Sequence, residues 1–231
     1  MNLAIIPARG GSKRIPHKNI KTFADRPIIA WSIKAAQNAG VFDRIIVSTD
    51  DTKIAEVARE FGAETPFERP AELSGDHIGL NPVISHAIEW QKLHGADPQY
   101  ICCICATAPL IKADDIKLGL QELEKSRADF TFSVTSYAFP IQRAIKLRSD
   151  GRVEMFDATQ FDKRSQDLTE AYHDAAQFYW GKQEAWLTSK PVFGAGSVPI
   201  FLSRYRVLDI DTPEDWQHAE LLMRALNQRP K

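Results

Sequence analysis

The chain has 231 residues, of which 44% are hydrophobic and 26% are charged, a composition that fits one large globular domain or one domain with a modest insertion. Its 29 basic and 30 acidic side chains give a net charge of −1, which does not indicate a nucleic-acid-binding or membrane-surface protein. An anionic ligand would therefore need a local concentration of positive charge. No apolar stretch approaches the ~18–20 residues of a membrane span, and the N-terminal apolar run ends early, at Pro7. We expect a cytoplasmic protein.

Short β-type runs alternate with helical patterns over the first 135 residues or so. Strands are predicted at Leu3–Pro7, Arg44–Ser48, Tyr100–Cys105 and Phe130–Thr135. Helices are predicted at Pro27–Asn38, Asp51–Phe61, Pro82–Leu93 and Ala113–Lys125. This alternation predicts an α/β fold with a doubly wound, mainly parallel, Rossmann-like sheet and helices on both faces. In such sheets, ligands bind outside the carboxyl ends of the strands.

The alternation stops between about residues 139 and 169, where the chain is polar and irregular with a hairpin predicted around Ser149–Gly151. We interpret residues 1–231 as a single domain with this one excursion, which could supply a lid or a subunit contact. The pattern resumes at Gln177–Trp180, Gly181–Leu187 and a strand-like run at Val207–Ile210. A last helix is predicted from Thr212 to about Leu226, because Thr212, Pro213 and Asp215 suit its N-cap, N1 and N3 positions.

A basic loop directly follows the first predicted strand. Residues 7–19 read Pro-Ala-Arg-Gly-Gly-Ser-Lys-Arg-Ile-Pro-His-Lys-Asn, which places four Lys and Arg side chains and His17 close together. The adjacent Gly10 and Gly11 would let backbone amides approach phosphate oxygens, and the cations would offset negative charge. A solvated basic turn is the alternative. The loop matches neither the P-loop nor the dinucleotide-binding fingerprint, so it predicts a nucleoside triphosphate site of another kind.

Two carboxylates lie two residues apart near the predicted C-terminal helix. In a strand-like run, Asp209 and Asp211 would point the same way, with Cα atoms ~6.5–7 Å apart. Such a pair suits Mg²⁺, which prefers oxygen ligands and keeps several waters. Pairs at this position also occur beside helix caps, so spacing alone leaves both roles open.

Residues 7–19 resemble the N-terminal signature of the CMP-sialic acid synthetases, the cytidylyltransferases that activate nine-carbon acidic sugars. Four further segments resemble other motifs of that family, in the same order along the chain: Arg44–Asp50, Arg69–Leu73, Ala106–Leu110 and Asp209–Thr212. Within the family, the pseudaminic acid cytidylyltransferases are the most similar, on the evidence of Phe139–Arg143, Lys163–Leu168 and Tyr172–Gly181. The strings Cys105–Leu110 and Ala175–Gln177 differ from those of sialic acid enzymes, so the contacts to the sugar should differ too.

The resemblance implies transfer of CMP from CTP to the anomeric C2 hydroxyl of pseudaminic acid, with release of pyrophosphate. The alternatives are the same reaction on N-acetylneuraminic, legionaminic or 3-deoxy-manno-octulosonic acid, and, from another class, a non-catalytic nucleotide-binding regulator. The acidic pair together with Lys18 favours an enzyme, because a pure binder would not need the metal. Pyrophosphate release with each sugar acid separates all of these.

The resemblance also assigns site residues. Nucleotide binding is expected of Ala8, Arg9, Gly10, Gly11, Ser12, Lys13, Lys18, Asn19 and, toward the cytosine, Arg69. The catalytic candidates are Arg9, Lys18 and Asp211, and Mg²⁺ is expected on Asp209 and Asp211. Arg143 and Arg164 are candidates for the sugar carboxylate, which a guanidinium binds bidentately, although either could be a surface or interface arginine. Hydroxyl or N-acyl contacts are expected of Gln142, Gln166, Tyr172, His173 and Tyr179.

The excursion is polar but carries scattered apolar residues, among them Phe139, Leu147 and Phe161. Such residues need a partner surface, and the resembled family commonly dimerises through an equivalent segment. We therefore expect a homodimer, with a sugar site that could be completed across the interface.

Overall fold

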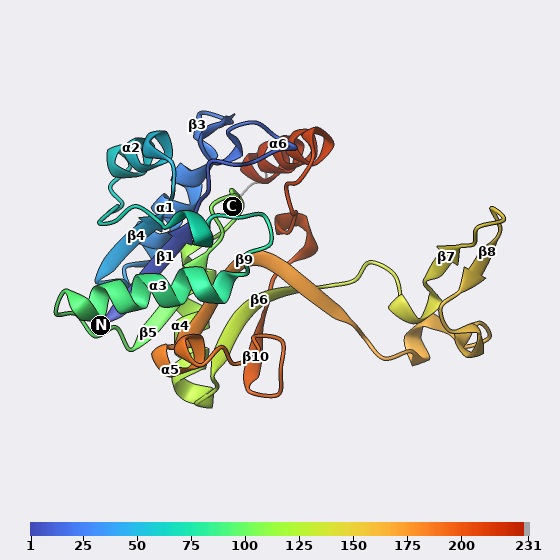
Figure 1. Cartoon of the computed structure of the whole chain (residues 1–231). Coiled ribbons are helices and arrows are strands. Elements are labelled where there is room, and N and C mark those ends of the chain that lie inside the picture. The colour runs from blue at the N-terminus through green and yellow to red at the C-terminus, as the bar shows by residue number, and fades with distance from the viewer. Residues whose placement is uncertain (229–231) are drawn as a thin grey trace.

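A computed structural model describes residues 1–228 and has a six-stranded sheet at its centre (Figure 1). In spatial order the strands are β10 (Ser197–Phe201), β6 (Phe130–Ser136), β9 (Tyr172–Lys182), β5 (Tyr100–Ile104), β1 (Asn2–Pro7) and β4 (Arg44–Ser48). β1 pairs in parallel with β4 and β5, and β10 pairs in parallel with β6. Only β9 is antiparallel to its neighbours β5 and β6. The prediction of an α/β fold with a mainly parallel sheet is confirmed.

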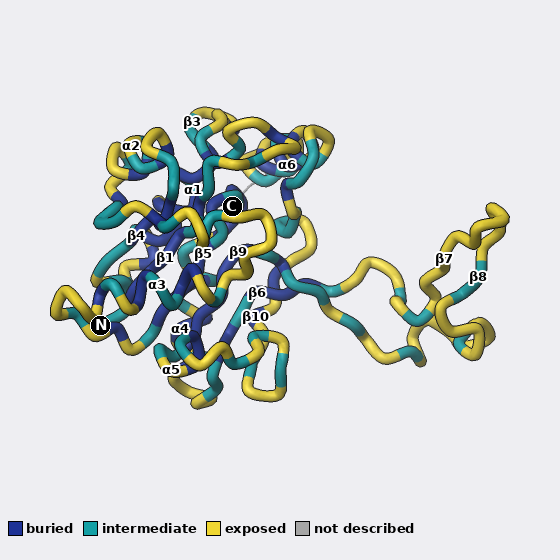
Figure 2. The backbone as a smooth tube through the Cα atoms, in the orientation of Figure 1, coloured by how far each residue is buried: buried dark blue, intermediate teal, exposed yellow. Residues whose placement is uncertain are grey.

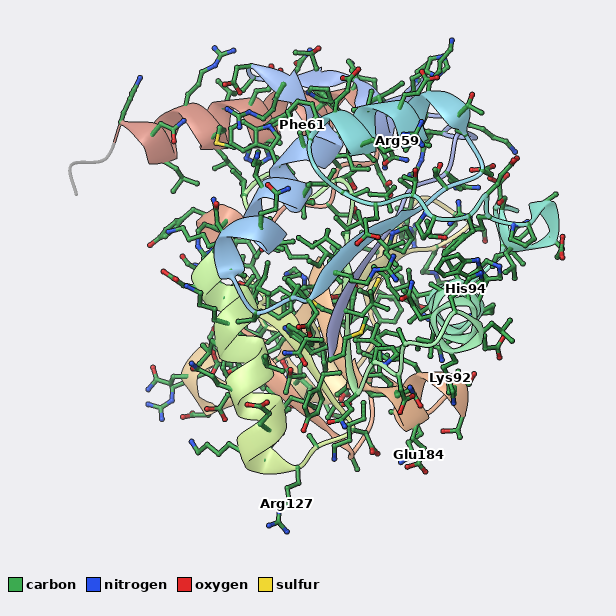
Figure 3. The ribbon with its side chains drawn as sticks, turned by 90° about the vertical axis from the view of Figure 1, so that its left-hand side faces the viewer. Arg59, Phe61, Lys92, His94, Arg127 and Glu184 are labelled. Atoms are coloured by element: carbon green, nitrogen blue, oxygen red, sulfur yellow. The ribbon has the colours of Figure 1, made fainter. Side chains whose placement is uncertain are left out.

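Helices cover both faces of the sheet. α1 (Ile28–Ala39), α2 (Thr52–Glu60) and α4 (Ala113–Ser126) contribute to the apolar cluster on one face, and α3 (Leu80–Leu93) and α5 (Gln183–Leu187) to that on the other. Figure 3 shows α4, which ends before Arg127, and α3, which ends before His94, on opposite sides of the sheet. Consecutive residues of β1 are buried on alternate faces, with Ile5 toward α3 and Ile6 toward α1. This burial on both faces explains the unbroken apolar run of the strand.

The chain from β10 to α6 (Pro213–Asn227) differs in part from the prediction. α6 begins as expected, with a capping box between Thr212 and Asp215 and with Pro at N1. The predicted strand at Val207–Ile210 is wrong: a short 3₁₀ turn at Arg204–Arg206 is followed by extended chain without strand pairing. Its apolar pattern arises because Ile210 packs beside α6 in a cluster with Trp216. The small strands β2 (Thr22–Phe23) and β3 (Arg26–Pro27) form a hairpin before α1.

Between β6 and β9 the chain leaves the sheet as an arm, residues 138–171, that extends away from the body (Figure 1). The predicted hairpin is confirmed: β7 (Ile145–Leu147) and β8 (Val153–Met155) pair antiparallel, with Gly151 at a φ of 78° in the connection. Figure 2 shows that most of the arm is exposed. Its large apolar side chains share this exposure, for example Phe139 at 83% and Leu147 at 75%. An arm of this kind presents apolar surface that the body of the same chain does not cover.

Among residues 1–228, no helix has the length and apolar character needed to cross a membrane.

Candidate active site

A cavity of about 540 Å³ opens at the carboxyl ends of β1 and β5. Its wall is formed by Pro7 and the loop that follows it, by parts of the segment 69–83, by residues 103–107 and by Asp211. This is the edge of a parallel sheet at which α/β proteins bind ligands. The position of the cavity agrees with the expectation drawn from the strand order.

The basic loop is held in place by contacts to the body and by a hydrogen bond within the loop. Ile15, 2% exposed, packs in the apolar cluster that contains Ile210 and Trp216, which brings the loop against the chain before α6. The Asn19 side-chain amide donates to the Arg9 carbonyl at 2.9 Å. Lys18 Nζ donates to the Ile210 carbonyl at 2.7 Å. The loop is therefore a fixed structure that presents its cations to the cavity.

Four cations of the loop line the cavity, and two carboxylates pair with them. Asp76 bridges Arg9 and Lys13, with Lys13 Nζ 2.5 Å from its Oδ2. Lys13 and Arg9 hold the pKa of Asp76 at about 2, so this carboxylate is charged at neutral pH. Asp211 Oδ2 lies 2.7 Å from Arg14 Nη2, and its Oδ1 lies 3.4 Å from Lys18 Nζ. An anionic ligand could exchange with these carboxylates for the same cations.

Arg69 supplies a fifth cation from a buried position. Its side chain is only 4% exposed, and burial lowers its pKa from the ordinary value while the charge of Asp50 opposes the shift. Arg69 Nε donates to Ser74 Oγ at 3.2 Å, and Nη2 lies 3.4 Å from Asp50 Oδ1. A guanidinium held in this way has a fixed direction. A group that recognises one end of a ligand needs such a fixed direction.

Asp209 and Asp211 form an acidic pair beside the cavity. Burial raises the pKa of Asp209, and the charge of Asp211 raises it further. Neither carboxylate caps α6, because Thr212 Oγ1 accepts the N–H of Asp215, while Asp215 Oδ2 accepts the N–H groups of Asp211 and Thr212. A divalent cation would offset the repulsion between the two carboxylates, so the pair fits Mg²⁺. Within residues 1–228, no group of three or more His, Cys, Asp and Glu side chains is arranged to hold a metal, so further ligands would be water or phosphate oxygens.

Comparison with known proteins identifies the family. A family model described as cytidylyltransferase matches residues 3–229. The chain belongs to the cytidylyltransferase family. It is 44% identical, over 97% of each chain, to a pseudaminic acid cytidylyltransferase of Campylobacter jejuni subsp. jejuni, and 29% identical, over 98% of this chain and 97% of the relative, to a CMP-N,N'-diacetyllegionaminic acid synthase of Legionella pneumophila. A solved CMP:2-keto-3-deoxy-manno-octonic acid synthetase complexed with CTP has the same fold, with a TM-score of 0.70, 14% identity and coverage of 97% of this chain and 99% of that chain.

The structure brings many of the predicted nucleotide-binding residues of this cytidylyltransferase, and one of the two predicted metal ligands, to one cavity. Those that line it are Arg9, Ser12, Lys13, Lys18, Asn19, Arg69 and Asp211. Ala8, Gly10, Gly11 and Asp209 are not part of its wall, and the Gly10 N–H already donates to Asp50 Oδ1 at 3.1 Å. Sequence reasoning missed Arg14, Asp76 and Thr107 as lining residues. Arg14 lies in the predicted loop, whereas nothing local to the sequence around Asp76 marks it.

Four of the predicted sugar-binding residues lie on the arm and outside the wall of this cavity: Gln142, Arg143, Arg164 and Gln166. Arg164 pairs bidentately with Asp167 at 2.7 and 3.1 Å, and Arg143 donates to the Lys163 carbonyl and to Ser165 Oγ. Gln142 Nε2 donates to the Thr169 carbonyl at 2.7 Å. Gln166 lines a second cavity, of about 360 Å³, at the base of the arm. Within one chain, these residues and the cavity at the carboxyl ends of β1 and β5 are separate.

The other three predicted sugar-binding residues lie on β9. Tyr172 is exposed and its ring meets that of Phe201 edge to face at 4.9 Å. His173 contacts Tyr137, with ring centroids 4.8 Å apart. Tyr179 is buried and donates from its hydroxyl to Asp174 Oδ2 at 2.5 Å, and burial raises its pKa. The β9 residues therefore span the distance from the arm to the core of the sheet.

Proposed function

We propose that the protein is a pseudaminic acid cytidylyltransferase, which transfers CMP from CTP to the C2 hydroxyl of pseudaminic acid and releases pyrophosphate. The observation that carries this proposal is the 44% identity, over 97% of both chains, to a relative of that name. The relative named for legionaminic acid is 29% identical over a similar length. We further propose a cytoplasmic location, where CTP is available.

Arg9, Lys13 and Lys18 would contact the triphosphate, with Asn19 beside them and Arg69 toward the cytosine. The support for this division is geometric: the three cations come from one loop at the carboxyl end of β1, whereas Arg69 enters the cavity from a different segment. In nucleotidyl transfer, catalysis depends mainly on positioning and on neutralising developing charge. Arg9 and Lys18 are therefore the catalytic cations of the proposal.

Enzymes of this family generally use a divalent metal. We propose that Asp209 and Asp211 hold Mg²⁺, supported by the burial of Asp209 and the charge of Asp211, which together raise the pKa of Asp209. When bound, the ion would supply polarisation of the α-phosphate. Asp211 is already in contact with Lys18 Nζ, so the metal and the phosphate-binding cation would be neighbours.

In the proposed reaction, the C2 hydroxyl of the sugar loses its proton to solvent and its oxygen forms a bond to the α-phosphorus, while the bond from that phosphorus to the oxygen bridging to the β-phosphate breaks. The electron pair of the broken bond leaves with pyrophosphate. Arg9 and Lys18, with Lys13 beside them, would stabilise the charge that accumulates on this leaving group, because guanidinium and ammonium groups form strong hydrogen bonds to phosphate oxygens. The chain's role is to align the two substrates.

The sugar would be bound through Arg164, Arg143 and the polar residues of the arm and β9. Because the arm residues are separate from the nucleotide cavity of their own chain, we propose a homodimer in which the arm of one copy reaches the cavity of the other. The exposed apolar side chains of the arm support this arrangement, since they require a covering surface.

The substrate is tested by incubating the purified protein with CTP, Mg²⁺ and each candidate sugar acid while pyrophosphate is measured. We expect release with pseudaminic acid. Release only with N-acetylneuraminic, legionaminic or 3-deoxy-manno-octulosonic acid would contradict the substrate assignment. CTP binding without release for any sugar would favour a nucleotide-binding regulator.

The shared site is tested by mixing Arg164→Ala and Asp211→Asn, after denaturation and refolding together, and measuring pyrophosphate release at a low sugar concentration at which each variant alone is inactive. If the arm serves the partner's cavity, each heterodimer has one site with neither substitution, so activity returns. A random mixture forms half heterodimers, and about a quarter of all sites would then be intact. If each site belongs to a single chain, every site carries one substitution and the mixture stays inactive.

A further inference from the structure

Asp50 contacts both halves of the nucleotide cavity without lining it. It follows β4, and its Oδ1 accepts the N–H of Gly10 at 3.1 Å. The same oxygen lies 3.4 Å from Nη2 of Arg69. The side chain of Asp50 is 28% exposed, whereas that of Arg69 is 4% exposed, so the carboxylate partners a buried charge.

On the loop side, Asp50 fixes one peptide group. The peptide between Arg9 and Gly10 has its carbonyl bound by the Asn19 side chain at 2.9 Å and its N–H bound by Asp50. With both ends held, the plane of this peptide is set, and with it the direction in which the loop begins. Close packing against the next residue, Asp51, also explains the glycine, because a Cβ at position 10 would lie 2.6 Å from Asp51 Oδ2.

On the other side, Asp50 partners the guanidinium of Arg69. The backbone N–H of Arg69 donates to the Thr49 carbonyl at 2.8 Å, so the turn after β4 holds both the main chain and the side chain of this arginine. A buried guanidinium that loses its carboxylate retains the cost of desolvation without the compensating charge. Arg69 would then have to turn toward solvent or another acceptor.

We propose that Asp50 is a positioning residue for the nucleotide, and that its single carboxylate fixes the phosphate-binding loop and the base-side arginine relative to each other. This rests on the proposed binding of CTP in the cavity at the carboxyl ends of β1 and β5. Asp50 acts through Gly10 and Arg69, since it is not part of the cavity wall. Its two contacts are chemically different: the N–H needs only an oxygen acceptor, whereas Arg69 needs a negative charge.

That difference gives a test with two variants and two ligands, CTP and inorganic tripolyphosphate, whose binding is measured by calorimetry. Asp50→Ala removes both contacts and should weaken both ligands, each by about tenfold or more. Asp50→Asn keeps an oxygen for the Gly10 N–H but removes the charge. It should leave tripolyphosphate binding within about twofold of wild type and weaken CTP by about tenfold. The control Asp51→Asn makes the same charge change one residue away, where Asn still caps α2.

The proposal is overturned if Asp50→Ala binds CTP as wild type does, if Asp51→Asn produces the same losses, or if Asp50→Asn weakens both ligands equally. Circular dichroism and thermal unfolding establish that each variant is folded at the temperature of measurement. Should Asp50→Ala fail to fold, the split between CTP and tripolyphosphate in Asp50→Asn decides alone. Wild-type protein that binds tripolyphosphate but no CTP would refute the proposed function, and the effect of Asp50→Ala on tripolyphosphate would still test the loop contact.

Discussion

The ion pair between Arg206 and Asp115 should support both the fold and the acidic segment of the active site. Arg206 Nη1 lies 2.5 Å from Asp115 Oδ2 and Nη2 lies 3.3 Å from Oδ1, with side-chain exposures of 12% and 17%. The Arg206 carbonyl also accepts a hydrogen bond from the buried Gln177 side chain. Residue 206 is thereby joined to α4 and to β9, a few residues before Asp209 and Asp211. We expect that breaking the ion pair between Arg206 and Asp115 will displace Asp209 and Asp211, the proposed metal site.

The substitution Asp115→Asn removes the charge while keeping the size of the side chain. Breaking a fully buried pair costs ~3–5 kcal/mol, whereas an exposed pair contributes ~0–1 kcal/mol. The small residual exposure places this pair between the two limits, so we expect a loss of about 2 kcal/mol in the free energy of unfolding. For a chain of this size that corresponds to a fall of roughly 4–8 °C in Tm. Because the acidic segment moves, kcat/KM at 25 °C should fall about tenfold or more.

Urea unfolding and pyrophosphate release measure the two effects, and Asp114→Asn is the matched control. Asp114 also lies in the first turn of α4, but its side chain is 92% exposed and its pairing with Lys117 is long, at 3.7 Å. Both variants lose the same favourable charge at a helix N-terminus, ~0.3–1 kcal/mol, so their difference isolates the pair with Arg206. Equal destabilisation by the two variants would refute the energetic argument. A destabilised Asp115→Asn with unchanged kcat/KM would refute the positioning argument.

Four further outcomes are expected. Asp211→Asn should abolish pyrophosphate release while urea unfolding stays close to wild type; near-normal turnover at saturating Mg²⁺ would exclude it from the metal site. Asp76→Asn should tighten CTP binding by about two- to fivefold, because the exposed ion pairs that CTP must replace contribute only ~0–1 kcal/mol each. Glu72→Gln makes an equal charge change outside the cavity wall and should not tighten CTP binding. Arg164→Ala should raise the KM for the sugar and leave the KM for CTP unchanged. An unchanged KM for the sugar would show that Arg164 is a surface residue without a role in sugar binding. Burial raises the pKa of Cys105 to about 12, so this thiol should react with Ellman's reagent at pH 8 far more slowly in the folded protein than in urea.

The elements that sequence reasoning located correctly are those whose pattern is set by local burial. β1 and β5 are apolar at every position between their ends because both faces of the sheet are covered. β10 was missed because only Ile200 of its five residues is buried and it includes Pro199, and its place depends on pairing with β6, which is distant in sequence. Val207–Ile210 was assigned wrongly for the converse reason. Its apolar residues serve a helix contact, and a strand requires a neighbouring strand that this segment lacks.

The same distinction applies to the active site. The four Lys and Arg side chains of the loop lie within residues 9–18, so their concentration was visible without a structure, and the position of the loop after a strand indicated the ligand-binding edge. The partners of those cations were not predictable in this way. Asp76 reaches Arg9 from 67 residues away, and Asp50 reaches Gly10 from 40 residues away. Neither carboxylate belongs to a local pattern that sets its direction, because only the packing of the strands brings these segments together.

The net charge of −1 conceals a candidate active site in which each of the four loop cations is already paired with a carboxylate. Each carboxylate at the cavity is shared by two cations: Asp76 by Arg9 and Lys13, and Asp211 by Arg14 and Lys18. A triphosphate can therefore gain these cations only by replacing carboxylates, and a divalent ion at Asp211 would draw that carboxylate away from the same cations that phosphates need. Each ligand removes a competitor of the other, and coupling between two binding events is reciprocal. On this argument, the metal and the nucleotide should each strengthen the binding of the other.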